Sequence, residues 1–438
     1  MLLENSSKKA TVRGTILYPP GRSDLQQFDD DAFHRWYPFV LGFSDQLVDS
    51  LLEKFGVKNT EHVLDPFCGS GTTLIECAKR KIPSIGIDAN PFAVFTARAK
   101  SEFRTDPDAV IAAATRVRSR YRKLVSSNRR FTDEAVYKYL DKSGMLKRGW
   151  ISPKPLRKAL VLREAIRRCK DERIASLFLL ALAADLPTNI GNMKFGPQIY
   201  RGKQKKDVDP IPFFSARVKA IVEDLRSSNG RRSYAAPVSL LGDARSLKPV
   251  LRRHFSKKIP KIRFVICSPP YPTEHDYTRH TRLELAFIDS VSTRQSLRSV
   301  KRGMIRSHTK GIYQDDLDDQ RAKKLPSVNA VSRRVAKAIK GKTSGFEKLY
   351  PTVVKAYFGG MKRHFGSLFR LMEAGGRAAY VVGDQAAYMR VPIRTAVLLG
   401  EAAESVGFKV EKIELWRRRW STGIKKHLDE NILFLIKP

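Results

Sequence analysis

The sequence predicts an α/β protein built on an open sheet, and three observations support this fold class. Residues 61–88 read as a short apolar strand, a glycine-rich turn, a helix and a second strand that ends in an aspartate, which is typical of a βαβ unit. A further apolar run at 264–267 opens into a proline-rich loop. Apolar strand-like runs return in the last third of the chain, at 377–382, 409–415 and 432–436.

The size and charge of the chain indicate a protein that contacts polyanions. Its 438 residues suffice for one large α/β domain with insertions, or for two to three ordinary domains. Lysine and arginine number 82 against 44 acidic residues, so the formal net charge is +38. The basic residues are spread through all thirds of the sequence. Such a charge attracts nucleic acid, which we therefore expect as the partner.

The cysteine usage indicates a reducing compartment, and the hydropathy pattern indicates a protein without a membrane anchor. Cys68, Cys77, Cys169 and Cys267 form neither a dense disulfide framework nor a CxxC metal pair, so we expect no metal site. The segment from Met1 to Gly14 is polar and basic, and we find no apolar stretch of the ~20 residues that a membrane-spanning helix needs. We therefore expect a cytoplasmic protein without a membrane partner.

The strand-like runs are separated by basic, less regular segments. Phe43, Leu47, Leu51 and Phe55 recur at helical spacing before the first strand, which predicts an amphipathic helix. We expect the following organisation: an N-terminal segment at 1–60 that packs over the ligand site, a core formed by 61–100, 236–290 and 346–438, a helical basic insertion at 101–235, and a second basic insertion at 290–345 that is mobile in part.

The first motif, Asp65-Pro66-Phe67-Cys68-Gly69-Ser70-Gly71-Thr72-Thr73, lies between a predicted strand and a predicted helix. Glycines at this position let the backbone approach a ligand closely, and the helix N-terminus offers free N–H groups. No Gly-Lys-Ser/Thr follows, which excludes a P-loop, and the glycine spacing is not that of a GxGxxG turn.

The second motif, Ser268-Pro269-Pro270-Tyr271, follows the apolar run at 264–267. Alone it would be a proline-rich turn with an aromatic plug. Together, the two motifs resemble the amino-methyltransferases, which move a methyl group from S-adenosylmethionine to an exocyclic amine of cytosine or adenine in DNA. The resemblance implies a Rossmann-like class I methyltransferase sheet whose last two strands form an antiparallel end.

The resemblance also implies the cofactor site. In this family the first motif wraps the methionine part of S-adenosylmethionine, and acidic residues after the next two strands meet the ribose and the adenine. The ribose position corresponds to Asp88 and the adenine position to Asp243, although an aspartate after a strand is more commonly a loop or helix cap. The implied cofactor-binding residues are Asp65, Phe67, Gly69, Ser70, Gly71, Thr72, Asp88 and Asp243.

The tetrad is expected to be the methyl-transfer site. An exocyclic amine is a poor nucleophile because its lone pair is delocalised into the ring. The Ser268 side chain and the Pro269 carbonyl, made rigid by Pro270, are expected to accept its N–H groups, and Tyr271 to stack on the flipped base. Cys267 raises the alternative of a cysteine nucleophile, as in cytosine-C5 enzymes, but the Pro-Cys-Gln pattern of that family is missing and a buried thiol is favoured.

The identity of the substrate rests on finer features. Serine at the first tetrad position favours cytosine-N4 in double-stranded DNA, whereas many enzymes of that type place the tetrad before the cofactor motif. Adenine-N6 of DNA, RNA and a non-enzymatic role in nucleic-acid binding are the alternatives. Arg279 and Arg282 are expected to bind phosphate or, alternatively, to pair with Glu284. The target sequence, a companion nuclease and the oligomeric state stay open.

Overall fold

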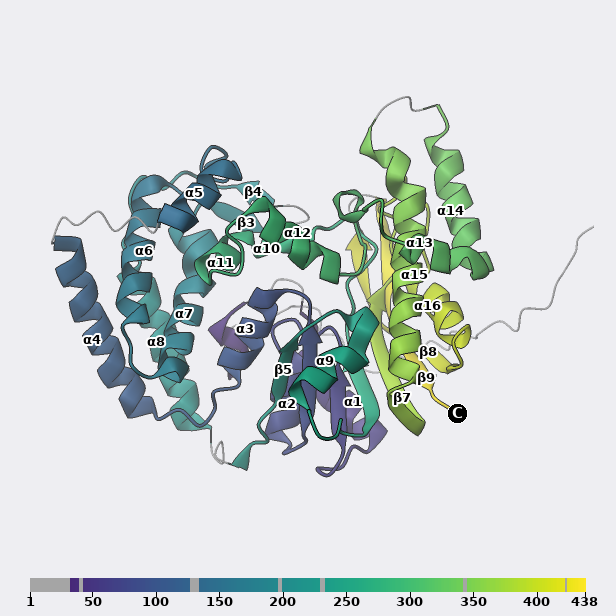
Figure 1. Ribbon diagram of the computed structural model, residues 1–438, viewed down its shortest axis with the longest axis horizontal. Helices are drawn as coiled ribbons and strands as arrows, with labels where there is room; N and C mark the ends of the chain where they lie inside the picture. The colour runs from purple at the N-terminus through teal and green to yellow at the C-terminus, as the bar shows by residue number, and fades with distance from the viewer. Residues whose placement is uncertain are drawn as a thin grey trace, which may run out of the picture.

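The computed structural model describes residues 32–38, 42–126, 134–195, 199–228, 233–341, 345–421 and 424–438. Residues 1–31 of the predicted N-terminal segment therefore lie outside the described residues. A central sheet separates two groups of helices, and a helical block stands beside it (Figure 1). This arrangement confirms the predicted α/β class.

The central sheet has seven strands in the order β5-β2-β1-β6-β7-β9-β8. The first five positions are parallel, and β9 runs antiparallel to both β7 and β8. The strand bounds are His62–Asp65 (β1), Ser84–Asp88 (β2), Val238–Leu241 (β5), Ile262–Cys267 (β6), Met372–Gly383 (β7), Lys409–Ser421 (β8) and Lys426–Ile436 (β9). The strand order reverses at β1, because the chain adds β2 and β5 on one side of β1 and then returns to add β6 and β7 on the other. Ligands are therefore expected above the carboxyl ends of β1, β2 and β6.

Apolar side chains alternate between the two faces of the sheet, as the two-residue repeat of a strand requires. One face packs against α1 (Asp45–Phe55) and α2 (Thr72–Lys79). The other face packs against α9 (Leu247–His254), α15 (Tyr350–Phe369) and α16 (Thr395–Glu404). The buried sheet residues are Val63, Phe264, Ile266, Ala379 and Val381 on the first face and Leu64, Val265, Cys267, Ala378, Tyr380 and Val382 on the second.

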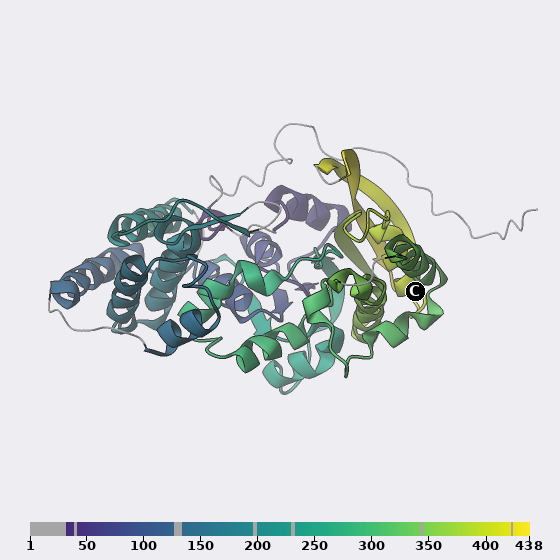
Figure 2. The same ribbon diagram turned by 90° about the horizontal axis from the view of Figure 1, so that it is seen from above.

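The segment expected as the first insertion is largely helical. After α3 (Pro91–Lys100) it comprises α4 (Pro107–Ser126), α5 (Glu134–Lys142), α6 (Pro153–Arg167), α7 (Glu172–Asp185), the hairpin of β3 (Met193–Phe195) and β4 (Ile199–Arg201), and α8 (Ile211–Ser227). These helices share one hydrophobic cluster, which also includes residues of α2, α3 and the later helix Arg282–Phe287, and they form a block at the opposite end from β8 and β9 (Figure 2). The segment Glu172–Ile190 is long and apolar enough to cross a membrane, but 67% of its apolar window is buried inside this block, as in the core helix of a globular domain.

The segment expected as the second insertion is more integrated than its composition predicts. It contains α12 (Arg294–Gly303), α13 (Asp318–Arg321) and α14 (Pro326–Ile339), preceded by α10 (Tyr277–His280) and α11 (Arg282–Phe287). The valines of α14 are buried in the same cluster as α15 and the sheet. The apolar stripe of α14 thus joins 326–339 to the core, contrary to the expected boundary at 346.

Strand boundaries differ from the sequence prediction. The strand expected at 377–382 runs from Met372 to Gly383 as β7. Strands β8 and β9 are also longer than their apolar stretches, because their added residues are polar and pair with each other in the ladder from Arg417↔Glu430 to Ser421↔Lys426.

Candidate active site

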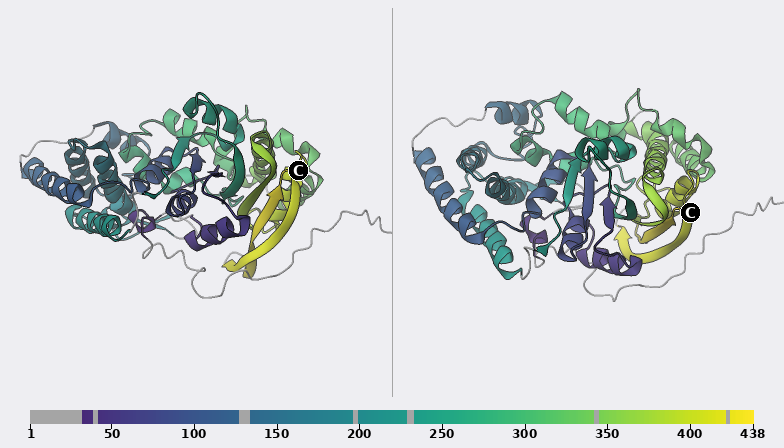
Figure 3. Two further views of the ribbon diagram at one scale, coloured as in Figure 1. Left: turned by 90° about the horizontal axis from the view of Figure 1, so that it is seen from below. Right: turned by 60° about the horizontal axis from the view of Figure 1, so that its bottom comes forward.

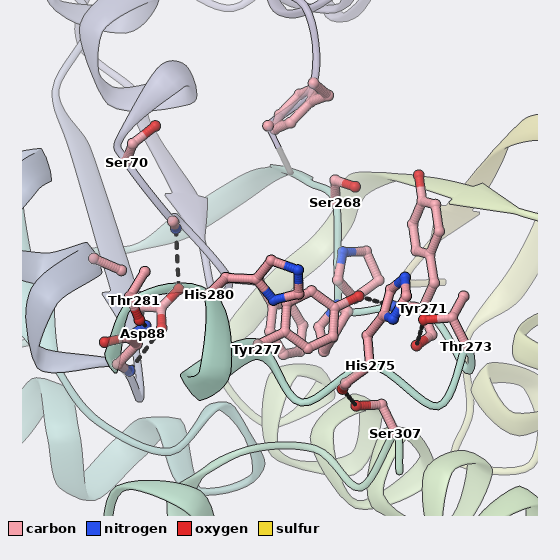
Figure 4. Close-up of a pocket in the computed structure, with 18 of the residues that line it drawn as sticks. Ser70, Asp88, Ser268, Tyr271, Thr273, His275, Tyr277, His280, Thr281 and Ser307 are labelled. Carbon is pink, nitrogen blue, oxygen red and sulfur yellow. Dashed lines mark hydrogen bonds between the residues drawn. The ribbon is translucent and has the colours of Figure 1, made fainter. Parts of the chain in front are cut away.

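A cavity of about 840 Å³ lies at the carboxyl edge of the sheet, where the loops after β1, β2 and β6 meet (Figure 4). The N-terminal segment contributes Tyr37, Pro38 and Phe43 to its wall, and the helical block contributes Thr188 and Phe195. Nine of the residues predicted from the motifs line this cavity together: Phe67, Gly69, Ser70, Thr72, Asp88, Ser268, Pro269, Pro270 and Tyr271.

The glycine turn has the backbone geometry that its sequence demands. Gly69 and Gly71 have φ angles of +49° and +89°, a region that disfavours other residues. A Cβ at position 71 would lie 3.0 Å from the Cβ of Ala97 on α3. Gly71 therefore permits close packing of the turn on α3 and does not itself line the cavity.

Asp88 connects the glycine turn to the end of β2. Its Oδ2 accepts a hydrogen bond from the backbone N–H of Gly69 at 3.0 Å, and its Oδ1 accepts one from Asn90 N–H at 2.8 Å. Burial raises the pKa of Asp88 to about 6, although these backbone donors act in the opposite direction. A carboxylate oriented in this way faces the cavity with lone pairs still free to accept hydroxyl groups.

Asp65 is placed differently from the other motif residues. Its side chain is buried behind the turn, where Oδ1 accepts the N–H of Phe67 at 3.0 Å. Its Oδ2 has no hydrogen-bond partner in the described part of the chain, and burial raises the pKa of Asp65 to about 7. Asp65 therefore stabilises the backbone of the turn from the protein interior and does not line the cavity.

The tetrad is fixed by hydrogen bonds from three other elements. The Ser268 hydroxyl donates to the carbonyl of Val381 on β7 at 3.1 Å. The Pro270 carbonyl accepts from the hydroxyl of Tyr357 on α15, and the N–H of Tyr271 donates to the hydroxyl of Tyr277 on α10, both at 2.8 Å.

This clamping leaves two acceptors available. Because the Ser268 proton points to β7, the lone pairs of Ser268 Oγ stay free to accept. Within the described residues, nothing donates to the carbonyl of Pro269. Both residues line the cavity, and Figure 4 shows Ser268 with Ser70 and Tyr271 along the same pocket.

Asp243 differs from its expected position. It caps the short helix Ala244–Ser246, accepting the Arg245 N–H at 2.8 Å. The Arg245 guanidinium folds back onto the same carboxylate, with Nη2 to Oδ2 at 2.8 Å. Ala244 lines the cavity and Asp243 does not. The arginine two positions later has engaged this carboxylate, so the capping alternative describes it better than an adenine contact.

The two arginines expected at phosphate also lie outside the cavity lining. Arg282 is largely buried and faces Asp276 at 3.5 Å, and Arg279 lies with its guanidinium carbon 5.8 Å from the Trp150 ring centre. The alternative pairing with Glu284 is wrong, because Glu284 is buried and accepts from the Tyr37 hydroxyl at 2.8 Å.

The structure adds residues that the motif analysis did not assign. His275, Tyr277 and His280 line the cavity from the segment after the tetrad, and Phe195 of the helical block lies 6.2 Å from the ring of His280. Lys301 also lines it and donates to Asp276. Burial alone would raise the pKa of Asp276, but Lys301 and His308 lower it to about 2. Only the dense polar and aromatic content of 273–280 signals this wall in the sequence.

A second unassigned group comes from the end of β8. Trp416, Arg417, Arg418, Arg419 and Trp420 all line the cavity, on the side opposite to the helical block. Their sequence signal is an aromatic and basic run that continues past the apolar strand.

Comparison with known proteins agrees with this geometry. Residues 37–98, which hold β1, β2 and the glycine turn, match the family model described as DNA methylase, of the N6/N4 type. The chain is 25% identical over 427 residues to the Type II methyltransferase M.BsoBI of Geobacillus stearothermophilus, an alignment that covers 89% of this chain and 81% of the relative.

Two further relatives support the same family. The Type II methyltransferase M.AvaI of Nostoc is 25% identical over 406 residues, covering 87% of this chain and 80% of the relative. A shorter match, 43% identical over 68 residues, joins 15% of this chain to 12% of the Type II methyltransferase M.MjaII of Methanocaldococcus jannaschii. The predicted resemblance is thus confirmed: the matched family model and these relatives support a DNA amino-methyltransferase of the N4-cytosine/N6-adenine family.

Proposed function

We propose that this protein methylates the N4 amine of cytosine in double-stranded DNA, by direct transfer from S-adenosylmethionine to a base flipped into the cavity. The main observation in favour of the proposal is the hydrogen bonding of Ser268. Its hydroxyl donates to Val381, so its oxygen is left as an acceptor beside the Pro269 carbonyl.

The residues around the glycine turn suit the cofactor. S-adenosylmethionine supplies a methyl group activated on a sulfonium. Asp88 is oriented by two backbone N–H donors and is suited to accept both ribose hydroxyls. Gly69, Ser70 and Phe67 line the same wall and would contact the methionine part and the adenine edge. Asp243 is left out of this assignment because Arg245 engages it.

The tetrad can activate the amine without a covalent intermediate. Ser268 Oγ and the Pro269 carbonyl each accept one N–H, which localises the nitrogen lone pair and directs it toward the methyl group. With the cofactor bound beside the glycine turn, the N–C bond would form as the S–C bond breaks, the demethylated cofactor would leave, and the amine would release one proton to water. Tyr271 stacks on the flipped base, and the tyrosine hydroxyls on α10 and α15 keep its backbone in place.

Cys267 is not needed for this chemistry. It is buried at the end of β6, and burial raises the pKa of its thiol well above the ordinary value. A thiol in that state is a poor nucleophile, which favours a packing role over attack on a cytosine ring.

One experiment tests the proposal. The purified protein is incubated with labelled S-adenosylmethionine and unmethylated duplex DNA, which is then digested to nucleosides and analysed by mass. N4-methylcytosine is the expected product. N6-methyladenine would keep the reaction class and refute the base assignment. Label in RNA but not in DNA would refute the DNA substrate, and the absence of cofactor binding would favour a binding protein.

A further inference from the structure

The β8–β9 hairpin extends past the edge of the sheet. Gly383, the last residue of β7, pairs with Glu430, and Glu430 pairs with Arg417. The ladder between β8 and β9 then continues to Ser421↔Lys426 with no further β7 residue beside it. Figure 3 shows this pair as a long curved ribbon whose far end extends beyond the other strands. The overhang lies on the carboxyl side of the sheet, where the cavity opens.

The overhang carries an exposed tryptophan. Trp420 has 56% of its surface exposed and still borders the cavity. Its one ring contact among the described residues is an edge contact with His427 across the ladder, with centroids 5.2 Å apart. A large aromatic ring left open at the tip of a hairpin is typical of a surface that binds a partner.

The charges around Trp420 favour a polyanion as that partner. From Arg417 to Glu430 the sequence contains five lysines and arginines against two acidic residues. Arg417 and Arg419 are held by Glu430 on the inner side of the hairpin. Arg418 has 64% of its side chain exposed, and its one ion pair among the described residues is with the half-exposed Asp429, a contact of little strength in water. Lys425 and Lys426 are exposed at the tip.

We propose that the β8–β9 hairpin is a DNA-binding arm in which Trp420 stacks on the bases next to the extruded one, while Arg418 and Lys426 bind the flanking phosphates. This inference rests on the proposed function and adds the element that stabilises the opened duplex. Extrusion of a base breaks its stacking and pairing, and an aromatic ring at the cavity mouth compensates part of that loss. The adjacent cations neutralise the backbone that must bend around the opening.

The test begins with the wild-type enzyme, which is used to map a methylated site in unmethylated genomic DNA. Two duplexes of about 30 base pairs that contain this site are then compared. In one the target base is paired, and in the other it is mismatched, so that it is already partly unstacked. Trp420→Ala is compared with Trp420→Phe, which keeps an aromatic ring, and with Phe346→Ala, which removes an equally exposed aromatic ring that does not border the cavity.

Trp420→Ala is expected to lower kcat/KM on the paired duplex about 10- to 100-fold, the range of one lost base-stacking contact. On the mismatched duplex, the decrease in kcat/KM caused by Trp420→Ala should be severalfold smaller. Trp420→Phe should recover most of the activity, and Phe346→Ala should match the wild type. Cofactor affinity should be unchanged in all variants.

Three results would overturn the inference: full activity of Trp420→Ala on the paired duplex, an equal loss on both duplexes, or a loss shared by Phe346→Ala. A failure of the proposed function is seen separately, because the wild type would then methylate no site in DNA or a base other than cytosine, before any variant is compared.

Discussion

At the scale of single residues, the Ser268 hydroxyl has the most direct consequence for chemistry. It is the side-chain acceptor that the proposed mechanism uses, and it donates its own proton to the Val381 carbonyl on β7. Ser268→Ala is expected to lower kcat about 10²- to 10³-fold, the usual effect of losing one oriented polar group, with an unchanged cofactor dissociation constant. Single-turnover methylation and equilibrium binding measure the two quantities.

A matched control for Ser268→Ala is Ser239→Ala. Ser239 lies within β5 of the same sheet, has a buried hydroxyl with no partner among the described residues, and does not border the cavity. Its removal should leave kcat within about twofold of the wild type. Equal activity of both variants would refute the role of Ser268.

The raised pKa of the Asp88 carboxyl leads to a prediction of how cofactor affinity depends on pH. Burial raises its pKa to about 6, so the carboxylate is ionised above pH 6 and neutral below it. Ribose hydroxyls donate to the ionised form, and cofactor affinity should therefore weaken as the pH falls from 7.5 to 5. Asp88→Asn should bind more weakly at pH 7.5 and lose most of this dependence. A titration at several pH values measures both, and a flat wild-type profile would contradict the assignment.

At the scale of elements, Asp224 of α8 holds the N-terminal segment over the cavity. Its side chain is buried and accepts from Phe33 N–H at 3.0 Å, from Trp36 Nε1 at 2.7 Å and from the Arg35 guanidinium. Asp224→Ala removes the buried acceptor of Phe33 N–H and Trp36 Nε1, and we expect it to lower the free energy of unfolding by about 3 kcal/mol. Because Tyr37 borders the cavity, cofactor affinity should also fall.

The adjacent acid provides the control. Glu223 is half-exposed and reaches Arg35 only at 3.7 Å, so Glu223→Ala should change stability by less than about 0.5 kcal/mol. Urea denaturation of both variants makes the comparison. Equal stabilities would mean that Asp224 does not anchor the segment.

The short helix Ala244–Ser246 offers a second test at this scale. Asp243→Ala removes its cap and one partner of Arg245, which is also held by Asp318. We expect a loss of about 1–2 kcal/mol in unfolding free energy, with cofactor affinity unchanged. Thermal denaturation and binding titration separate the effects. A strong loss of cofactor affinity at unchanged stability would restore the adenine contact expected from the sequence.

At the scale of the whole molecule, the net charge of +38 predicts steeply salt-dependent DNA binding. A protein that contacts 6–10 phosphates loses roughly 10³- to 10⁵-fold in affinity between 50 and 200 mM salt. We expect a dependence of this order for a 30-base-pair duplex, and little effect of salt on cofactor binding. Fluorescence anisotropy at four salt concentrations measures the slope, and a slope near zero would contradict a phosphate-dominated contact.

Much of the sheet was predictable because its strands are buried on both faces. Runs such as 264–267 are apolar throughout, and each of the six predicted strand runs overlaps a strand. The ends of β8 and β9 were missed because their residues pair with each other in a two-stranded ribbon, with no sheet neighbour to bury them. Apolar periodicity carries no signal there.

In the candidate site, too, some residues were predictable from the sequence and others were not. Local sequence patterns were enough to indicate the family resemblance and the residue types at two strand ends, because a glycine turn and a rigid Ser-Pro-Pro-Tyr loop need those residues locally. The pairing of Asp243 with Arg245 and of Arg282 with Asp276 became visible in the folded chain. Folding also brought Trp420 to the cavity mouth. These outcomes depend on competing partners that the fold brings together, which local sequence patterns do not encode.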